Sequence, residues 1–203
     1  ASELGARALP LDVTDPASVA DFAEQVEGCR LLVNNAGGAI GLEPVAEADL
    51  SDWQAMYDSN VLGAVRVTQA LLAQLVASGA GHVVTIGSIA GLEPYPGGGG
   101  YNAAKHAIRA VMEVLRMELL GQPVRVTEID PGMVETEFSV VRFRGDEARA
   151  ASVYEGVDAL TPEDIAECVG WAAELPDRVN IDRIVVKPRD QASARMVHRR
   201  SQP

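Results

Sequence analysis

Hydrophobic positions along the chain fall into short continuous runs that alternate with longer segments of helical periodicity. Five short runs are bounded by turn residues: residues 6–11, 30–34, 82–86, 124–129 and 181–186. Each predicts a strand, and the β-branched run at 82–86 is typical of a strand that is covered on both faces.

Helical patterns occupy the segments between these runs. Asp15 and Pro16 open a first helix, because the fixed φ of proline suits a first helical turn. Further helices are predicted at residues 51–78, 101–120 and 161–175, the last of them capped by Thr161-Pro162-Glu163-Asp164. The first of these three carries a row of apolar and small polar residues at helical spacing: Val61, Leu62, Val65, Thr68, Leu72 and Leu75. This face should lie on a sheet.

The alternation of strand and helix indicates the class of fold. It predicts an α/β protein with a doubly wound, Rossmann-like parallel sheet and right-handed helical crossovers. Residues 1–203 form a single domain in this interpretation. Ligands of such folds bind beyond the carboxyl ends of the strands.

Composition and charge exclude several other classes. Of the 203 residues, 47% are hydrophobic and 23% are charged, which excludes a disordered, collagen-like or coiled-coil chain. The formal net charge of -12 would repel nucleic acids and anionic membranes. No signal peptide pattern or apolar run near the roughly 20 residues of a bilayer span is found, so we expect a cytoplasmic protein. Cys29 and Cys168 match no disulfide or metal-site spacing, and no metal is expected.

Tyr101 and Lys105 are four residues apart, so on a helix their side chains share one face. At ~5 Å and an effective dielectric of ~20, the ammonium would stabilise a tyrosinate by roughly 3 kcal/mol, which lowers the tyrosine pKa by about 2 units. A phenol so tuned can exchange protons with a substrate oxygen. The YxxxK pattern alone also fits an ordinary solvated helix face.

Ser88 strengthens the catalytic interpretation. Ser88 stands at the end of the strand predicted at 82–86, and a turn-rich loop after it can bring it back to Tyr101 and Lys105. The glycines at 97–100 in that loop do not follow the first strand of a βαβ unit, so a flexible connection is favoured over a phosphate site.

Three more motifs occur in order along the chain: Asn-Asn-Ala-Gly at 34–37, Asn-Val-Leu-Gly at 60–63 and Pro-Gly-Met-Val-Glu-Thr at 131–136. With the serine, tyrosine and lysine, these motifs resemble the short-chain dehydrogenases/reductases over essentially the whole chain. The resemblance implies a nicotinamide-dependent oxidoreductase that interconverts a secondary alcohol and a ketone.

The resemblance also implies roles for individual residues. Tyr101 would exchange the proton, Lys105 would lower its pKa and hold the nicotinamide ribose, and Ser88 would polarise the substrate oxygen. Asn60 would hold a water that links Lys105 to solvent. The implied cofactor contacts are Asp12, Val13, Asn34, Ala36, Gly37, Tyr101, Lys105, Pro131, Gly132, Val134 and Thr136.

Three later segments resemble one particular group within the family. Residues 136–146, 159–164 and 179–181 are similar to NADP-dependent 3-hydroxy acid dehydrogenases that oxidise serine and L-allo-threonine. This likeness implies a small hydroxy acid as substrate and NADP as cofactor, with NAD left open. Arg142 and Arg144 become candidates for binding the substrate carboxylate, against the alternative of solvated surface arginines. The helices at 51–78 and 101–120 resemble the pair through which family members assemble, so we expect a homotetramer.

The chain departs from the family pattern at its start. The family's first strand, its TGxxxGxG phosphate loop and its second strand do not occur in the sequence. Residues 1–15 instead resemble the approach to the third strand, so we expect an N-terminally incomplete domain with a gap in its sheet. Two alternatives stay open: a non-catalytic nucleotide sensor or scaffold with the same fold, and a sugar-nucleotide epimerase, which also uses YxxxK. An epimerase needs a larger C-terminal domain.

Overall fold

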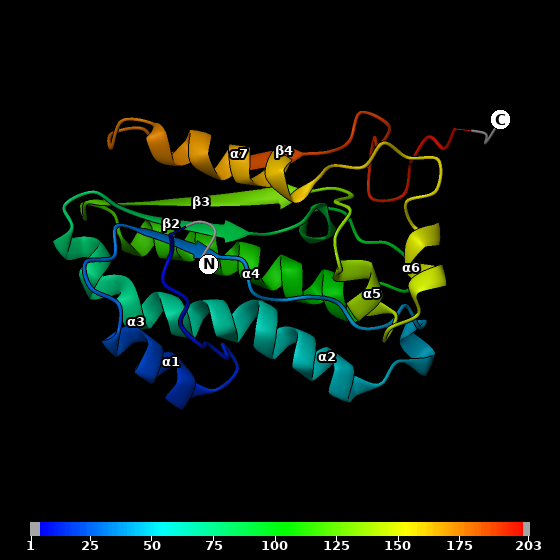
Figure 1. The fold of residues 1–203 in the computed structure, drawn as a ribbon, viewed down its shortest axis with the longest axis horizontal. Helices are drawn as coiled ribbons and strands as arrows, with labels where there is room; N and C mark the ends of the chain where they lie inside the picture. The colour runs from blue at the N-terminus through cyan, green and yellow to red at the C-terminus, as the bar shows by residue number, and fades with distance from the viewer. Residues whose placement is uncertain (1–4, 201–203) are drawn as a thin grey trace.

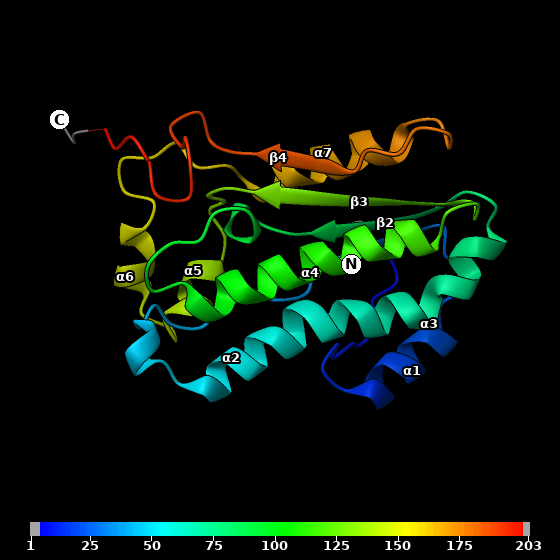
Figure 2. The same cartoon turned by 180° about the vertical axis from the view of Figure 1, so that it is seen from behind.

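A computed structural model describes residues 5–200 and shows a parallel sheet of four strands in the order β1-β2-β3-β4 (Figures 1 and 2). The strands are β1 Leu31–Asn34, β2 Gly81–Ile86, β3 Val124–Pro131 and β4 Arg183–Val186. All three pairings are parallel. The α/β class and four of the five predicted strands are therefore confirmed.

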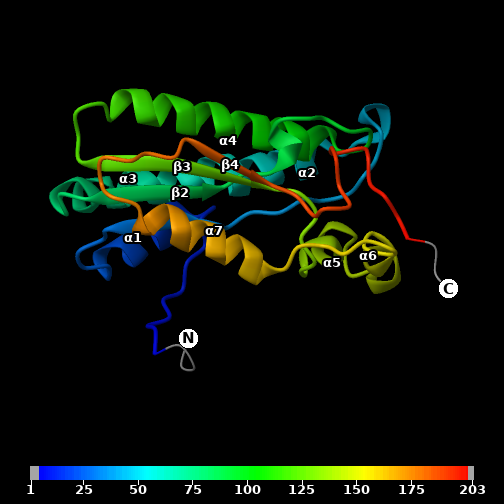
Figure 3. The same cartoon turned by 90° about the horizontal axis from the view of Figure 1, so that it is seen from above.

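The strand predicted at residues 6–11 is wrong. These residues are irregular and mostly exposed, and they lead into a turn in which Asp12 Oδ1 accepts a hydrogen bond of 2.8 Å from the Thr14 amide. Figure 3 shows the segment leaving the sheet. A strand needs a partner, and among residues 5–200 β1 pairs with β2 alone. The four strands are contiguous, so the expected gap within the sheet is not observed either.

Helices cover both faces of the sheet. On one face, α3 Gly63–Ala77 contacts β1 and β2, and α4 Gly99–Glu118 contacts β3. On the opposite face, α7 Pro162–Glu174 contacts β3 (Figure 3). The smaller elements are α1 Pro16–Glu24, α2 Leu50–Tyr57, α5 Phe138–Arg142, α6 Glu147–Ser152, a π-helical turn η3 Asp58–Leu62, and the 3₁₀ turns η2 Val45–Glu47 and η4 Ile89–Gly91.

Two helices begin at the caps that the sequence predicts. Asp15 caps α1 by accepting a hydrogen bond of 3.0 Å from the Ala17 amide. Thr161 and Asp164 form a reciprocal capping box at the start of α7, with proline in the first turn. These caps satisfy backbone donors that have no partner within the helix.

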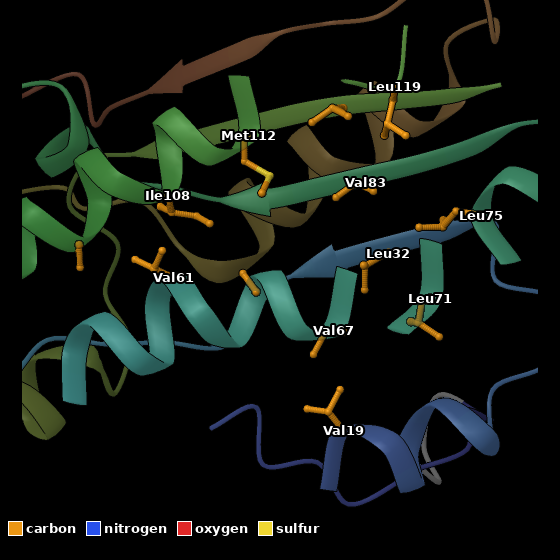
Figure 4. Close-up of a cluster of buried hydrophobic side chains, with 13 residues drawn as sticks. Val19, Leu32, Val61, Val67, Leu71, Leu75, Val83, Ile108, Met112 and Leu119 are labelled. Atoms are coloured by element: carbon orange, nitrogen blue, oxygen red, sulfur yellow. The ribbon is translucent and has the colours of Figure 1, made fainter. Parts of the chain in front are cut away.

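The main hydrophobic core lies between the sheet and α3 and α4, where Leu71, Leu75, Val83 and Ile108 are at most 2% exposed (Figure 4). The buried face agrees with the predicted one only in part: Val61, Thr68 and Leu75 are buried as expected. Leu62 is 39% exposed, and Val67 and Leu71 are buried although they were not predicted. The π-helical turn η3 directly before α3 widens the helix there and so shifts the row of side chains that faces the sheet.

The run from Leu50 to Ala77 spans 28 residues and has an 18-residue window with a mean hydropathy of 1.3. By length and composition it would suit a membrane span, contrary to the expectation that no segment does. In the structure it has the position of a core helix, because α3 packs on β1 and β2 and α2 packs on α4.

Candidate active site

A cavity of about 920 Å³ lies at the carboxyl ends of β1, β2 and β3, where ligands of parallel α/β folds bind. Its wall includes the four residues predicted to be catalytic: Asn60, Ser88, Tyr101 and Lys105. They come from three segments that are far apart in the sequence, and the sheet brings them together. The cavity is large enough for a substrate and part of a dinucleotide.

Ser88 directly follows β2 and caps the turn η4. Its backbone is extended, and its Oγ accepts a hydrogen bond of 3.1 Å from the Ala90 amide. Its own amide donates to Asp130 Oδ1 over 2.8 Å. Because Oγ accepts from the backbone, its hydroxyl hydrogen is free to point toward the cavity.

Tyr101 and Lys105 lie one turn apart in the first half of α4, and both are about 8% exposed. The Tyr101 ring lies against Phe138, with 5.5 Å between the ring centroids. Lys105 Nζ lies 5.7 Å from the centroid of the Tyr101 ring and donates a hydrogen bond of 2.9 Å to the Ile86 carbonyl. The two side chains therefore share the helix face that the sequence predicts.

The pKa of Tyr101 does not follow the sequence expectation. Burial raises this pKa above its ordinary value, and the hydrogen bond with Ser88 and the charge of Arg142 oppose the rise only in part. Burial also lowers the pKa of Lys105 to about 8, against the opposing charges of Asp130 and Glu128. Desolvation outweighs the charge pairing of Tyr101 with Lys105 at both residues, because both side chains are buried.

Asn60 lies in the π-helical turn η3, a local distortion that is often found at functional sites. Its Nδ2 donates to the carbonyls of Gly38 and Met56 over 2.9 and 2.7 Å. Its buried Oδ1 has no hydrogen-bond partner among residues 5–200. A Cβ on Gly37 would lie 2.5 Å from that oxygen, and Gly37 has a φ of 141°, so only glycine suits this position.

The predicted cofactor residues divide into two groups. Besides Tyr101 and Lys105, five of them line the cavity: Gly37, Pro131, Gly132, Val134 and Thr136. Asn34 and Ala36 do not line it. The Asn34 side chain is buried and donates a hydrogen bond of 2.9 Å to Thr68 Oγ1, which joins β1 to α3. Asn34 therefore has a structural role, and its neighbours Val33 and Asn35 line the cavity instead.

Asp12 and Val13, the predicted adenine contacts, lie outside this cavity. Asp12 is exposed and holds its own turn through Thr14. Val13 packs so close to α3 that a Cβ on Gly63 would lie 2.7 Å from its side chain. The structure does not bring these two residues to the catalytic group.

The two candidate carboxylate-binding arginines are in different environments. Arg144 is exposed, has a positive φ of 55° and pairs with Asp52. Arg142 is buried: its Nε donates to the Gly41 carbonyl and its Nη1 to the Tyr95 hydroxyl, each over 3.0 Å. Its buried Nη2 has no hydrogen-bond partner in the described part of the chain. The alternative of a solvated surface arginine is therefore wrong for Arg142.

Several wall residues were not singled out in the sequence. They are apolar or lie beside known motifs: Gly38, Ile86, Gly87, Glu137, Phe138, Val141, Pro162, Ile165, Ala166 and Val169. Spacing gave no signal for the α7 residues, because helix periodicity shows an apolar face but not what the face covers. Asp130, which holds the Ser88 amide, could have been noticed as a buried charge directly before the Pro-Gly motif.

The wall suits the nicotinamide end of a dinucleotide. Gly37 and Gly132 bring the backbone to the cavity wall, and the polar groups of Lys105 and Tyr101 at the same wall could bind ribose hydroxyls. The unpartnered Asn60 Oδ1 supplies a polar atom at the same place. A glycine-rich phosphate loop does not occur among residues 5–200. No cluster of three metal-ligating side chains occurs in that range either.

Comparisons with known proteins identify the family of the chain. An uncharacterized oxidoreductase of Mycobacterium tuberculosis is 56% identical over 194 residues, which cover 96% of this chain and 77% of that protein. The NADP-dependent 3-hydroxy acid dehydrogenase YdfG of Salmonella typhi is 45% identical over 205 residues, covering 97% and 83%. The solved closed form of a serine dehydrogenase complexed with NADP+ matches with a TM-score of 0.88 and 43% identity, covering 94% of this chain and 79% of that one.

The family model described as short chain dehydrogenase matches residues 1–146, which include the catalytic candidates and the Pro-Gly motif. The expected family and enzyme class are thereby confirmed. The chain belongs to the short-chain dehydrogenase family and is an oxidoreductase of that family.

Proposed function

We propose that this oxidoreductase interconverts a 3-hydroxy acid, such as serine or L-allo-threonine, and the corresponding 3-oxo acid, with NADP as cofactor. The observation that carries the substrate class is Arg142. Its guanidinium carbon lies 5.8 Å from the Tyr101 ring centroid, and its Nη2 is buried without a partner among residues 5–200. A carboxylate would supply that partner. NADP is supported by the similar enzymes, which carry NADP in their names or titles.

The side chains divide the proton chemistry between them. In the reduction direction Tyr101 donates its hydroxyl proton to the carbonyl oxygen of the substrate, and in oxidation its oxygen accepts that proton. Ser88 donates a hydrogen bond to the same oxygen and so stabilises its developing charge. The Lys105 ammonium favours the tyrosinate that forms. A bound dinucleotide would exchange a hydride with the carbon that bears the oxygen.

We also assign Asn60 to the route by which a proton travels between solvent and Tyr101. Its buried Oδ1 faces Gly37 at the cavity wall, where it can hold a water between Lys105 and solvent. Such a water would return the proton that Tyr101 loses in each turnover.

The alternative of a nucleotide sensor or scaffold predicts binding without turnover. All four proposed catalytic side chains lie at the cavity wall, which favours an enzyme over a sensor: Asn60, Ser88, Tyr101 and Lys105. A panel of 3-hydroxy acids, neutral secondary alcohols and sugars, assayed for NADPH and NADH formation by the full-length protein, tests both proposals. We expect turnover of 3-hydroxy acids with NADP. Dinucleotide binding without turnover of any alcohol would favour the sensor.

We also propose that the protein is a homotetramer. A hollow of about 650 Å³ lies on the outer side of α2 and α4 and is lined by apolar residues such as Leu50, Trp53 and Leu62. Leu50 is 66% exposed and Tyr57 is 45% exposed. A second copy of the chain would cover this face, and exposed apolar patches often mark such interfaces.

A further inference from the structure

Two acidic side chains of β3 lie close to Ser88. Neither takes part in the proton transfer proposed for the reaction. Glu128 and Asp130 are two residues apart on β3, so they point to the same face of the sheet, and they are 3% and 1% exposed. Buried carboxylates are costly unless they are paired, which makes this cluster informative.

One arginine, Arg183, pairs with both carboxylates. Arg183 on β4 contacts Glu128 Oε2 at 3.0 Å and Asp130 Oδ2 at 3.2 Å, and its Nη2 also contacts Glu113 of α4 at 2.9 Å. Arg109 of α4 pairs with Glu113. Lys105, also of α4, is near enough for the charges of both carboxylates to raise its pKa against the effect of burial.

Of these two carboxylates, Asp130 also forms a hydrogen bond with the backbone of Ser88. Its Oδ1 accepts a hydrogen bond of 2.8 Å from the Ser88 amide. Its Oδ2 lies 3.2 Å from Arg183 Nε, at ion-pair distance, and makes no hydrogen bond within residues 5–200. The approach is so close that a Cβ on Gly87 would collide with Asp130 Oδ1. A bulkier residue before Ser88 would therefore push the carboxylate and the serine apart.

We propose that Asp130 is a positioning residue, whose carboxylate, held by Arg183, fixes Ser88 through its amide and couples its own charge to Lys105 and Tyr101. This inference rests on the proposed function for its kinetic consequence, but the contact with Ser88 is independent of it. Burial raises the pKa of Asp130 to about 7, with a further rise from Glu128 and opposing effects from the Ser88 amide, Arg183 and Lys105. A carboxyl with this pKa would change its charge near neutral pH.

The direct test observes the Ser88 amide. Gly87–Ser88 is the one Gly-Ser pair in the sequence, so labelling glycine with ¹³C at the carbonyl and serine with ¹⁵N selects this single amide for NMR. In the wild-type chain of these 203 residues, we expect the Ser88 resonance to shift with pH, with a midpoint near 7, and the shift to vanish in Asp130→Asn. A Ser88 resonance that does not move between pH 5 and 9, or that moves equally in both proteins, would overturn the proposal.

Kinetics separate positioning from a merely structural role. Asp130→Asn keeps an oxygen acceptor for the amide, whereas Asp130→Ala removes it. We expect Asp130→Ala to lower kcat about 10-fold or more with little change in KM for the dinucleotide, and Asp130→Asn to restore most of kcat. Because the Asp130 charge raises the pKa of Tyr101, Asp130→Asn should move the acidic limb of the oxidation profile to lower pH.

Thr127→Val is the matched control. Thr127 is the intervening residue of β3, is 1% exposed, and its hydroxyl bonds to His82 on the other face of the sheet. It should cost stability without changing the pH profile. Equal losses of kcat in the alanine and asparagine variants, with an unshifted profile, would show that Asp130 is merely structural. If the wild type oxidises no 3-hydroxy acid, the proposed function fails, and the Ser88 titration still decides this inference.

Discussion

At the scale of single residues, desolvation dominates the chemistry of the site. Burial disfavours the charged form of both Tyr101 and Lys105, so it raises one pKa and lowers the other. Both shifts oppose the tyrosinate and ammonium pair that the mechanism uses in oxidation. The polar groups around them, Ser88, Arg142 and Asp130, therefore determine how far the pair can form.

The role of Tyr101 predicts a selective loss. Tyr101→Phe removes the exchanged proton but keeps the ring against Phe138, so turnover should fall by about 100-fold or more while the melting temperature and dinucleotide affinity stay close to wild type. Steady-state kinetics and fluorescence titration with NADPH measure both. Lys105→Ala is the contrasting variant and should weaken both binding and rate. Retention of most of kcat in the phenylalanine variant would contradict the assignment.

The buried Arg142 predicts selectivity for acids. Arg142→Met should raise KM for 3-hydroxy acids by about 10- to 150-fold, the value of a lost charged hydrogen bond, with a smaller effect on neutral alcohols. The comparison between substrates matters, because Arg142 also holds the Gly41 carbonyl and the Tyr95 hydroxyl, and a general disturbance would affect both classes equally. Arg144→Met, at the exposed neighbour, should leave the ratio unchanged. Equal losses on acids and alcohols would show that Arg142 only supports the loop.

At the scale of elements, helix α4 lines the active-site cavity with one side, and with its other side it forms a partly exposed apolar surface together with α2. Tyr101 and Lys105 face the cavity, whereas Ala103 of the same helix lines the outer hollow with Leu50 and Trp53. An interface on this surface would hold the two helices, and with them the catalytic tyrosine, in place.

Assembly through this surface can be broken by one charge. Leu50→Lys places an ammonium in the outer hollow and should reduce the tetramer mass measured by light scattering, because a buried unpaired charge opposes association. Met196→Lys is a matched control, since Met196 is equally exposed at 66% but does not line the hollow. A wild-type monomer at micromolar concentration, or equal dissociation in both variants, would rule out this interface.

Element boundaries also show where sequence reasoning succeeded. The caps at Asp15 and Thr161 were predicted because capping uses side chains within a few residues of each other. The π-helical turn at Asp58–Leu62 was not predicted. Nothing local in the sequence demands it, and the contacts of Asn60 with Gly38 and Met56 stabilise it in the folded protein.

At the scale of the whole molecule, the buried acidic cluster makes stability depend on pH. The pKa of Asp130 is raised to about 7 in the folded state, so between the ordinary aspartate range and pH 7 the folded protein binds more protons than the unfolded one. Stability from this group is therefore present at low pH and is lost as the pH rises from about 4 toward 7.

Replacing Asp130 with asparagine should remove this pH dependence of the stability. Asp130→Asn mimics the protonated carboxyl, so the difference in unfolding free energy between this variant and the wild type should grow in favour of the variant from about pH 4 to about pH 7 and then level off. Urea denaturation at several pH values measures it. A difference that is constant with pH would show that the Asp130 carboxyl titrates at its ordinary pKa.

The sequence by itself determined the class of fold, four of the strands, the long helices and the residues at the centre of the site. These features depend on periodicity, on short-range caps and on motifs such as Tyr101 and Lys105, which one helical turn places on the same face. The tertiary structure decided that residues 6–11 form no strand, because a strand exists only with a neighbour to pair with. It also decided the pKa directions at Tyr101 and Asp130 and the burial of Arg142, because desolvation depends on side chains that are distant in the sequence.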